Sequence, residues 1–160
     1  METLLKPKIK DLLNKSILSE LYASNLYKHI ANQLQRLGLF GSQKFFLKES
    51  AEELEHYQTI VNYVNDMGDV ADMPQIPTMK DKVNSLSDAI EIAYETEVEL
   101  MKHYQEAYEI AEDSKDCITA TFFIDFMQIQ RKAVGQYGDL ISRLKLNGDI
   151  YQFDKELGKL

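Results

Sequence analysis

The chain has 160 residues and a formal net charge of −8, with 26 acidic against 18 basic residues. This length is most simply one domain, residues 1–160, and is sufficient to bury a core. The acidic balance argues against a nucleic-acid partner, because a phosphate-binding surface needs a basic patch. The only cysteine, Cys117, excludes an internal disulfide framework and a Cys-x-x-Cys metal site. We expect Cys117 to be a small buried residue.

The chain opens with lysines mixed among leucines, which is unlike the apolar core of a signal peptide. No segment approaches the roughly 18 apolar residues of a membrane span. We therefore expect a soluble, cytoplasmic protein with no membrane partner.

The sequence predicts helices almost throughout, because strand signals are nearly absent. Prolines interrupt the helical pattern only near the start and in one loop. We predict four long helices and one short helix, over about residues 7–37, 42–67, 85–113, 116–146 and 149–158. Ser85 and Asp88 form a capping box for the third helix, and Asp116 is a cap for the fourth. Asn147 and Gly148 should end the fourth helix.

The connections between these helices predict their arrangement. Residues 38–41 form a short turn, so the first two helices should be antiparallel. Residues 69–84 form a connection long enough to cross the length of a bundle. The expected fold is all-α: an up-down-down-up four-helix bundle with a long crossover and a short fifth helix. On that last helix, one apolar face should be formed by Ile150, Phe153, Leu157 and Leu160.

Each long helix carries a polar residue near the middle of its inward-facing stripe. In chain order, these residues are Glu20, Glu53 with His56, Glu97 and Gln130. Taken singly, each has a simpler interpretation as a solvated side chain, part of an acidic face or a hydrogen-bonded core histidine. Glu53 and His56, however, are three residues apart and share a helix face, where a carboxylate and an imidazole can bind one transition metal ion. Three glutamates in one core would repel each other unless metal ions neutralised them, so the joint pattern predicts a metal centre.

These motifs resemble the non-haem ferritins, and the likeness covers essentially the whole chain. The segment from Glu20 to Tyr27 is similar to the family's Glu-x-x-x-x-x-x-Tyr, and residues 52–56 are similar to its Glu-Glu-x-x-His. Gln130 matches the glutamine that ferritins carry on the fourth helix. Residues 151–157 look like the fifth helix of bacterial ferritins. Ferritin-like bundles as a class hold two metal ions between carboxylates of facing helices.

The resemblance implies a ferroxidase centre that oxidises Fe(II) with oxygen or hydrogen peroxide. It assigns the first iron to Glu20, Glu53 and His56, with Glu53 as the bridge between the two irons. It assigns the second iron to Glu97, with Gln130 as a weak ligand. Tyr27 would form a hydrogen bond within the centre and could donate an electron. The two irons per subunit would be transient. Ferric mineral would then form inside a hollow homo-oligomeric shell of twenty-four chains.

The sequence departs from related patterns at several positions. Gln130 is followed three residues later by Ala133 instead of a histidine, so the second iron should be held weakly. The acids of a third iron site on the fourth helix are also missing. Glu52 and Glu55 resemble acids proposed as secondary iron or nucleation sites, although a solvated acidic face is an equal interpretation. Leu54 stands where bacterioferritins carry their haem-binding methionine, so we expect no haem.

Two other functions compete with iron storage. The reduced ligand set of the fourth helix would suit a ferritin-like cage with a degenerate centre. A peroxide-consuming di-iron detoxification protein is disfavoured, because the chain lacks both a second Glu-x-x-His and a Cys-x-x-Cys module.

Overall fold

The computed structural model describes residues 2–146 and 148–160, and within them it contains five α-helices and no strand. The helices are α1 (Pro7–Arg36), α2 (Phe40–Asp66), α3 (Leu86–Asp113), α4 (Cys117–Leu144) and α5 (Ile150–Leu157). Each helix begins and ends within two residues of its predicted bounds. The predicted all-α class is confirmed. None of the described helices is long and apolar enough to cross a membrane.

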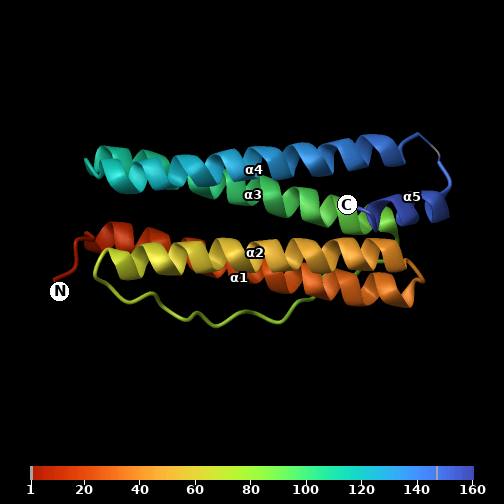
Figure 1. Cartoon of the computed structure of the whole chain (residues 1–160), viewed down its shortest axis with the longest axis horizontal. Helices are drawn as coiled ribbons and strands as arrows, with labels where there is room; N and C mark the ends of the chain where they lie inside the picture. The colour runs from red at the N-terminus through yellow and green to blue at the C-terminus, as the bar shows by residue number, and fades with distance from the viewer. Residues whose placement is uncertain (1, 147) are drawn as a thin grey trace.

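The four long helices pair as α1 with α2 and α3 with α4, and the crossover connection runs along α1 (Figure 1). Several side-chain contacts tie this connection to α1, among them the following three. Lys10 Nζ lies 2.6 Å from Asp69 Oδ1, His29 Nε2 lies 2.8 Å from the carbonyl oxygen of Asp81, and Gln33 Oε1 accepts from the Val83 amide at 2.9 Å. The crossover returns the chain to the far end of the bundle, so that α3 runs antiparallel to α1 (Figure 1).

Local capping signals read from the sequence act as predicted. Ser85 Oγ accepts from the Asp88 amide at 3.1 Å, and Asp116 Oδ1 accepts from the Thr119 amide at 3.0 Å. These bonds satisfy amides that have no partner within their own helix. The helix α4 ends at Leu144, shortly before the stop predicted at Asn147 and Gly148. Asn147 lies outside the described residues.

The start of α2 has no cap of its own and is capped from α5. Asp154 is 5% exposed, and its carboxylate accepts from the Gly41 amide at 3.1 Å, the Ser42 amide at 2.7 Å and Ser42 Oγ at 2.6 Å. A Cβ at Gly41 would lie 1.9 Å from the carbonyl oxygen of Asp154, so this close packing requires glycine. Gly41, which we predicted to lie in the turn, is therefore in the first turn of α2.

The capping contact also corrects the predicted face of α5. Phe153 and Leu157 are buried, but Ile150 and Leu160 are 48% and 59% exposed. The helix is rotated so that Asp154 reaches the α2 amides, which leaves Ile150 and Leu160 outside the interface. Cys117 is also exposed, contrary to prediction, because it starts α4 at the end of the bundle.

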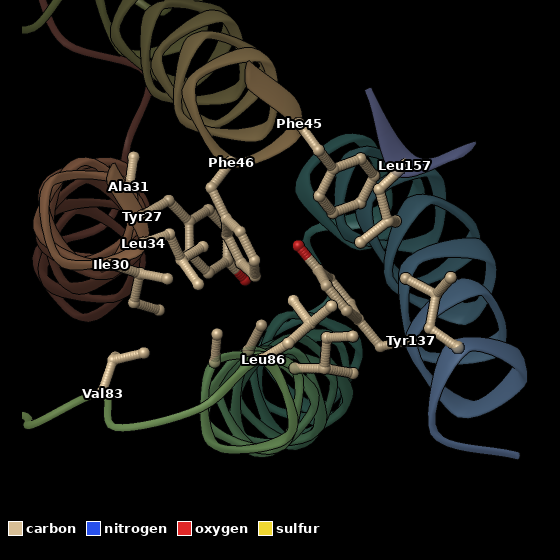
Figure 2. Packing of buried hydrophobic residues seen from close by; sticks show 14 of the residues in the cluster. Tyr27, Ile30, Ala31, Leu34, Phe45, Phe46, Val83, Leu86, Tyr137 and Leu157 are labelled. Atoms are coloured by element: carbon tan, nitrogen blue, oxygen red, sulfur yellow. The ribbon is translucent and has the colours of Figure 1, made fainter. Parts of the chain in front are cut away.

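The core consists of two apolar clusters separated along the bundle by polar residues. One cluster includes Tyr27, Phe45, Phe46 and Tyr137, whose rings pack edge to face, stacked or tilted between α1, α2 and α4 (Figure 2). The other, towards the opposite end, is built from residues such as Leu13, Ile17, Ile60, Phe123 and Phe126. On α1, Glu20 and Ser24 fall between the two clusters and are themselves buried. A polar site thus lies inside an otherwise apolar bundle.

Candidate metal centre

Three of the predicted ligands meet in the middle of the bundle. Glu20 on α1 and Glu53 and His56 on α2 each offer one ligand atom, and these atoms lie within 4.8 Å of one another. Glu20 is fully buried, Glu53 is 4% exposed and His56 is half-buried. The helical spacing explains the convergence, because Glu53 and His56 share one face of α2 and that face packs against the stripe of α1 that carries Glu20.

The hydrogen bonds at this cluster leave an acceptor unused. Tyr104 on α3 donates to Glu20 Oε1, while Glu20 Oε2 is buried and has no hydrogen-bond partner. His56 Nδ1 lies 3.2 Å from Glu53 Oε2 and 3.8 Å from Glu20 Oε2. A buried carboxylate oxygen without a donor is costly, so this oxygen is suited to a cation.

The other two predicted ligands form an adjoining group around Glu97. Tyr27 donates to Glu97 Oε1, and Gln130 Nε2 donates to Glu97 Oε2 at 2.6 Å. Both Glu97 and Gln130 are fully buried. Gln130 Oε1 is a second buried oxygen without a partner. Since each carboxylate oxygen has more than one lone pair, Glu97 can keep these hydrogen bonds and still contact a cation.

In the metal-free centre, the pKa values of Glu53, Glu97 and His56 are all raised. Burial, followed by the neighbouring Glu20 carboxylate, raises the pKa of Glu53 to about 8. Burial, followed by the charge of Glu53, raises the pKa of Glu97 to about 7. Burial opposes the charged form of His56, but the neighbouring carboxylates of Glu20 and Glu53 outweigh it and raise its pKa to about 10. Near neutral pH, protons therefore compensate part of the buried negative charge, and a divalent cation that binds here must displace them.

The structure adds a fourth buried acid that the sequence reasoning missed. Glu49 on α2 is 8% exposed, and its Oε2 accepts from Tyr137 at 3.0 Å. Burial, followed by the charge of Glu52, raises the pKa of Glu49 to about 7. The signal was present, because Glu49 precedes Glu53 by four residues and so lies on the same face of α2.

The remaining predicted acids lie away from the buried group. Glu52 and Glu55 are both exposed on α2, with Lys48 Nζ 3.8 Å from Glu52 Oε1. The hydroxyls of Tyr104 and Tyr137 each donate to a buried glutamate, Glu20 and Glu49 respectively. Periodicity identifies a side chain as inward-facing, but it does not tell which partner on another helix its hydroxyl will meet.

The donor set suits iron. Carboxylate oxygens with one imidazole bind Fe(II), and the carboxylates also favour Fe(III). The buried group offers the carboxylates of Glu20, Glu53 and Glu97 and the imidazole of His56. It offers no thiolate, since Cys117 is exposed at the start of α4. A helical bundle with such a group in its core defines the class of carboxylate-rich metal-binding bundles.

The chain belongs to the ferritin family, because the family profile of the ferritin-like domain matches residues 10–147. A probable bacterial non-heme ferritin-like protein of Haemophilus influenzae is 26% identical over 161 residues, covering 98% of both chains. A bacterial non-heme ferritin of Staphylococcus aureus is 27% identical over 159 residues, covering 97% of this chain and 96% of the relative.

Solved structures agree with this assignment. An open-pore ferritin from the hyperthermophilic archaeon Archaeoglobus fulgidus superposes with a TM-score of 0.93 at 26% identity, covering 96% of both chains. A humanized archaeal ferritin superposes with a TM-score of 0.92 at 28% identity and the same coverage. The predicted resemblance to ferritins and the predicted ferritin-like bundle are both confirmed.

Proposed function

We propose that this chain is the subunit of an iron-storage ferritin that oxidises Fe(II) in its buried centre and stores Fe(III) as a mineral. The observation that carries the proposal is the cluster of Glu20, Glu53 and His56, in which Glu20 Oε2 is buried without a partner. Family membership supports iron as the metal. Because iron passes through the centre as substrate, its ligands should bind it reversibly.

Each buried residue has a defined task in this proposal. Glu20, Glu53 and His56 bind the first Fe(II), and Glu53 also faces the second. Glu97, with the free Oε1 of Gln130, binds the second Fe(II). Because α4 contributes only the neutral amide of Gln130, the second ion would be held more weakly than the first and could leave after oxidation.

The redox balance is set by the pair of ions. Two Fe(II) ions supply two electrons, which reduce one oxygen molecule to hydrogen peroxide or one hydrogen peroxide to two water molecules, with two protons taken up in either case. The protons that Fe(II) displaces from Glu53 and Glu97 are available in the same pocket. Tyr27 donates a hydrogen bond to Glu97 and would hold this ligand in place beside the second Fe(II).

The product is expected to collect inside a shell of twenty-four chains, as the likeness to ferritins implies. Exposed Glu52 and Glu55 would offer secondary iron sites on the surface of α2. We infer no haem, because Leu54 stands where the resemblance would place a haem-binding methionine and its side chain cannot bind iron.

The proposal is tested by titrating iron-free protein anaerobically with Fe(II) and mixing it with oxygen in a stopped-flow instrument. A fast phase that saturates near two irons per chain, followed by slow growth of ferric absorbance, is the expected result. Glu53→Ala should abolish the fast phase and leave the assembly intact, because Glu53 would touch both ions. Glu109→Ala, which changes an exposed glutamate on α3, is the control and should keep the fast phase.

The alternatives give different results in the same experiment. A fast phase seen with hydrogen peroxide but not with oxygen would identify a peroxide-consuming protein. No fast phase with either oxidant would favour a cage with a degenerate centre. An unchanged fast phase in Glu53→Ala would show that oxidation occurs elsewhere.

A further inference from the structure

The centre contains a second tyrosine that mirrors Tyr27. On α1, Tyr27 follows Glu20 by seven residues, and on α3, Tyr104 follows Glu97 by seven residues. Each hydroxyl donates to the glutamate of the other helix: Tyr27 to Glu97 Oε1, and Tyr104 to Glu20 Oε1. Both tyrosines are fully buried.

The antiparallel course of α1 and α3 explains this crossed pattern. Seven residues are about two turns of helix, so both residues of each pair face the same way. Because the helices run in opposite directions, moving forward from Glu20 brings Tyr27 level with Glu97, and moving forward from Glu97 brings Tyr104 level with Glu20. The two helices therefore present one glutamate and one hydroxyl to each half of the centre, related by an approximate two-fold axis.

The Tyr104 hydrogen bond has a direct consequence for Glu20. It directs Oε1 towards Tyr104 and so orients the carboxylate, with Oε2 turned towards His56. A glutamate held in this way can give a metal ion one oxygen but cannot easily chelate it with both. The first ion then keeps a coordination position open for the oxidant.

We propose that Tyr104 is the positioning residue of the first iron site and holds Glu20 as a one-oxygen ligand, as Tyr27 holds Glu97 at the second site. The inference rests on the proposed function, since it concerns the two metal positions of that centre. Tyr104 acts through Glu20 and does not itself contact iron. The neighbouring packing supports a fixed orientation, because the Tyr104 ring lies against Phe126 with a centroid distance of 4.9 Å.

The test uses Co(II), whose visible absorption reports its coordination number without any turnover. Metal-free protein is titrated anaerobically, and the spectrum is resolved for the first and second Co(II) bound per chain. His56→Ala, which should lose one equivalent, identifies the signal of the first site. The variants are Tyr104→Phe and Tyr27→Phe, with Tyr108→Phe as control, because Tyr108 lies one turn further along α3 and is only half-buried.

Tyr104→Phe should shift and weaken the bands of the first-site Co(II), as Glu20 becomes free to chelate, and should leave the second-site spectrum unchanged. Tyr27→Phe should change the second-site spectrum alone, and Tyr108→Phe should change neither.

Two results would overturn the inference. An unchanged first-site spectrum in Tyr104→Phe would show that Glu20 is oriented by other contacts. Equal changes at both sites in Tyr104→Phe would indicate a general loss of packing, which thermal unfolding of the same variant would reveal independently. Wild-type protein that binds fewer than two Co(II) ions per chain would contradict the proposed two-metal function instead.

Discussion

At the scale of single residues, the buried glutamates of the centre repel one another when they are ionised. Bound protons or metal ions reduce this repulsion. Glu53, Glu97 and Glu49 all have pKa values raised by burial, and they lie close enough for their charges to interact. A buried carboxylate pays a desolvation penalty that an opposite charge must offset. The metal-free protein should therefore be less stable than its packing alone would allow.

Replacing Glu97 by glutamine should reveal this cost. The pKa of Glu97 is about 7 in the folded protein against an ordinary value of 4.5, so the folded state binds more protons between these pH values. The free energy of unfolding therefore falls as the pH rises from about 4.5 to about 7, and the loss is complete above that range. At pH 8, metal-free Glu97→Gln should be more stable than wild type, with a gain on the order of 3 kcal/mol or less.

The gain should disappear near pH 4.5, where Glu97 is neutral in both states. Gln130 can rotate its amide so that its unused Oε1 accepts from the new side chain. Thermal unfolding at several pH values measures the effect, and Glu109→Gln, an exposed position on α3, serves as control. A stability difference that stays constant from pH 4.5 to pH 8 would contradict the ionisation argument.

At the scale of elements, α5 is held by a contact that stabilises two helices at once. Asp154 caps the start of α2, and the chain end is fixed by Lys44 Nζ on the Gly158 carbonyl oxygen at 3.0 Å and Lys48 Nζ on that of Leu160 at 2.6 Å. A carboxylate at a helix N-terminus also interacts favourably with the helix dipole. The docking of α5 therefore depends on atoms at the first turn of α2.

Gly41→Ala should detach α5, because the added Cβ would lie 1.9 Å from the backbone oxygen of Asp154. The loss of the charged cap should cost about 2 kcal/mol. Gly135→Ala is the matched control, since a Cβ there meets nothing within 4 Å and helical alanine is favoured over glycine. Amide hydrogen exchange of residues 150–157, with thermal unfolding, measures both. Unchanged protection of α5 in Gly41→Ala would show that the junction can adjust.

The sequence predicted the elements well and the contacts between them poorly. The Ser85 and Asp116 caps act within four residues of their partners, so local pattern was sufficient to find them. The Asp154 cap joins residues 112 positions apart, and nothing local distinguishes it from a surface aspartate. Tyr104 follows Glu97 by seven residues and so shares its face of α3, but its bond to Glu20 depends on the antiparallel register of α1 and α3.

At the scale of the whole molecule, α5 and its flanks carry several of the exposed apolar residues, which makes this region a candidate for contact between chains. Leu146, Ile150, Tyr151 and Leu160 are between 48% and 79% exposed, and all belong to α5 or its flanks. Exposed apolar side chains that gather in one region are typical of interfaces between protein chains. This arrangement supports a role for α5 in assembly, in addition to its capping of α2.

If the chain assembles into the proposed shell, deleting residues 149–160 should give smaller oligomers, as measured by sedimentation velocity. The deletion removes the Asp154 cap together with the exposed apolar surface, so a second variant must separate the two effects. The double substitution Ile150→Ser with Tyr151→Ser removes exposed apolar side chains but keeps Asp154 on α2. If α5 supports the shell through its surface, both variants should dissociate, but only the deletion should lower the unfolding temperature of the subunit. Intact large particles after the deletion would show that α5 is dispensable for assembly and serves only to cap α2.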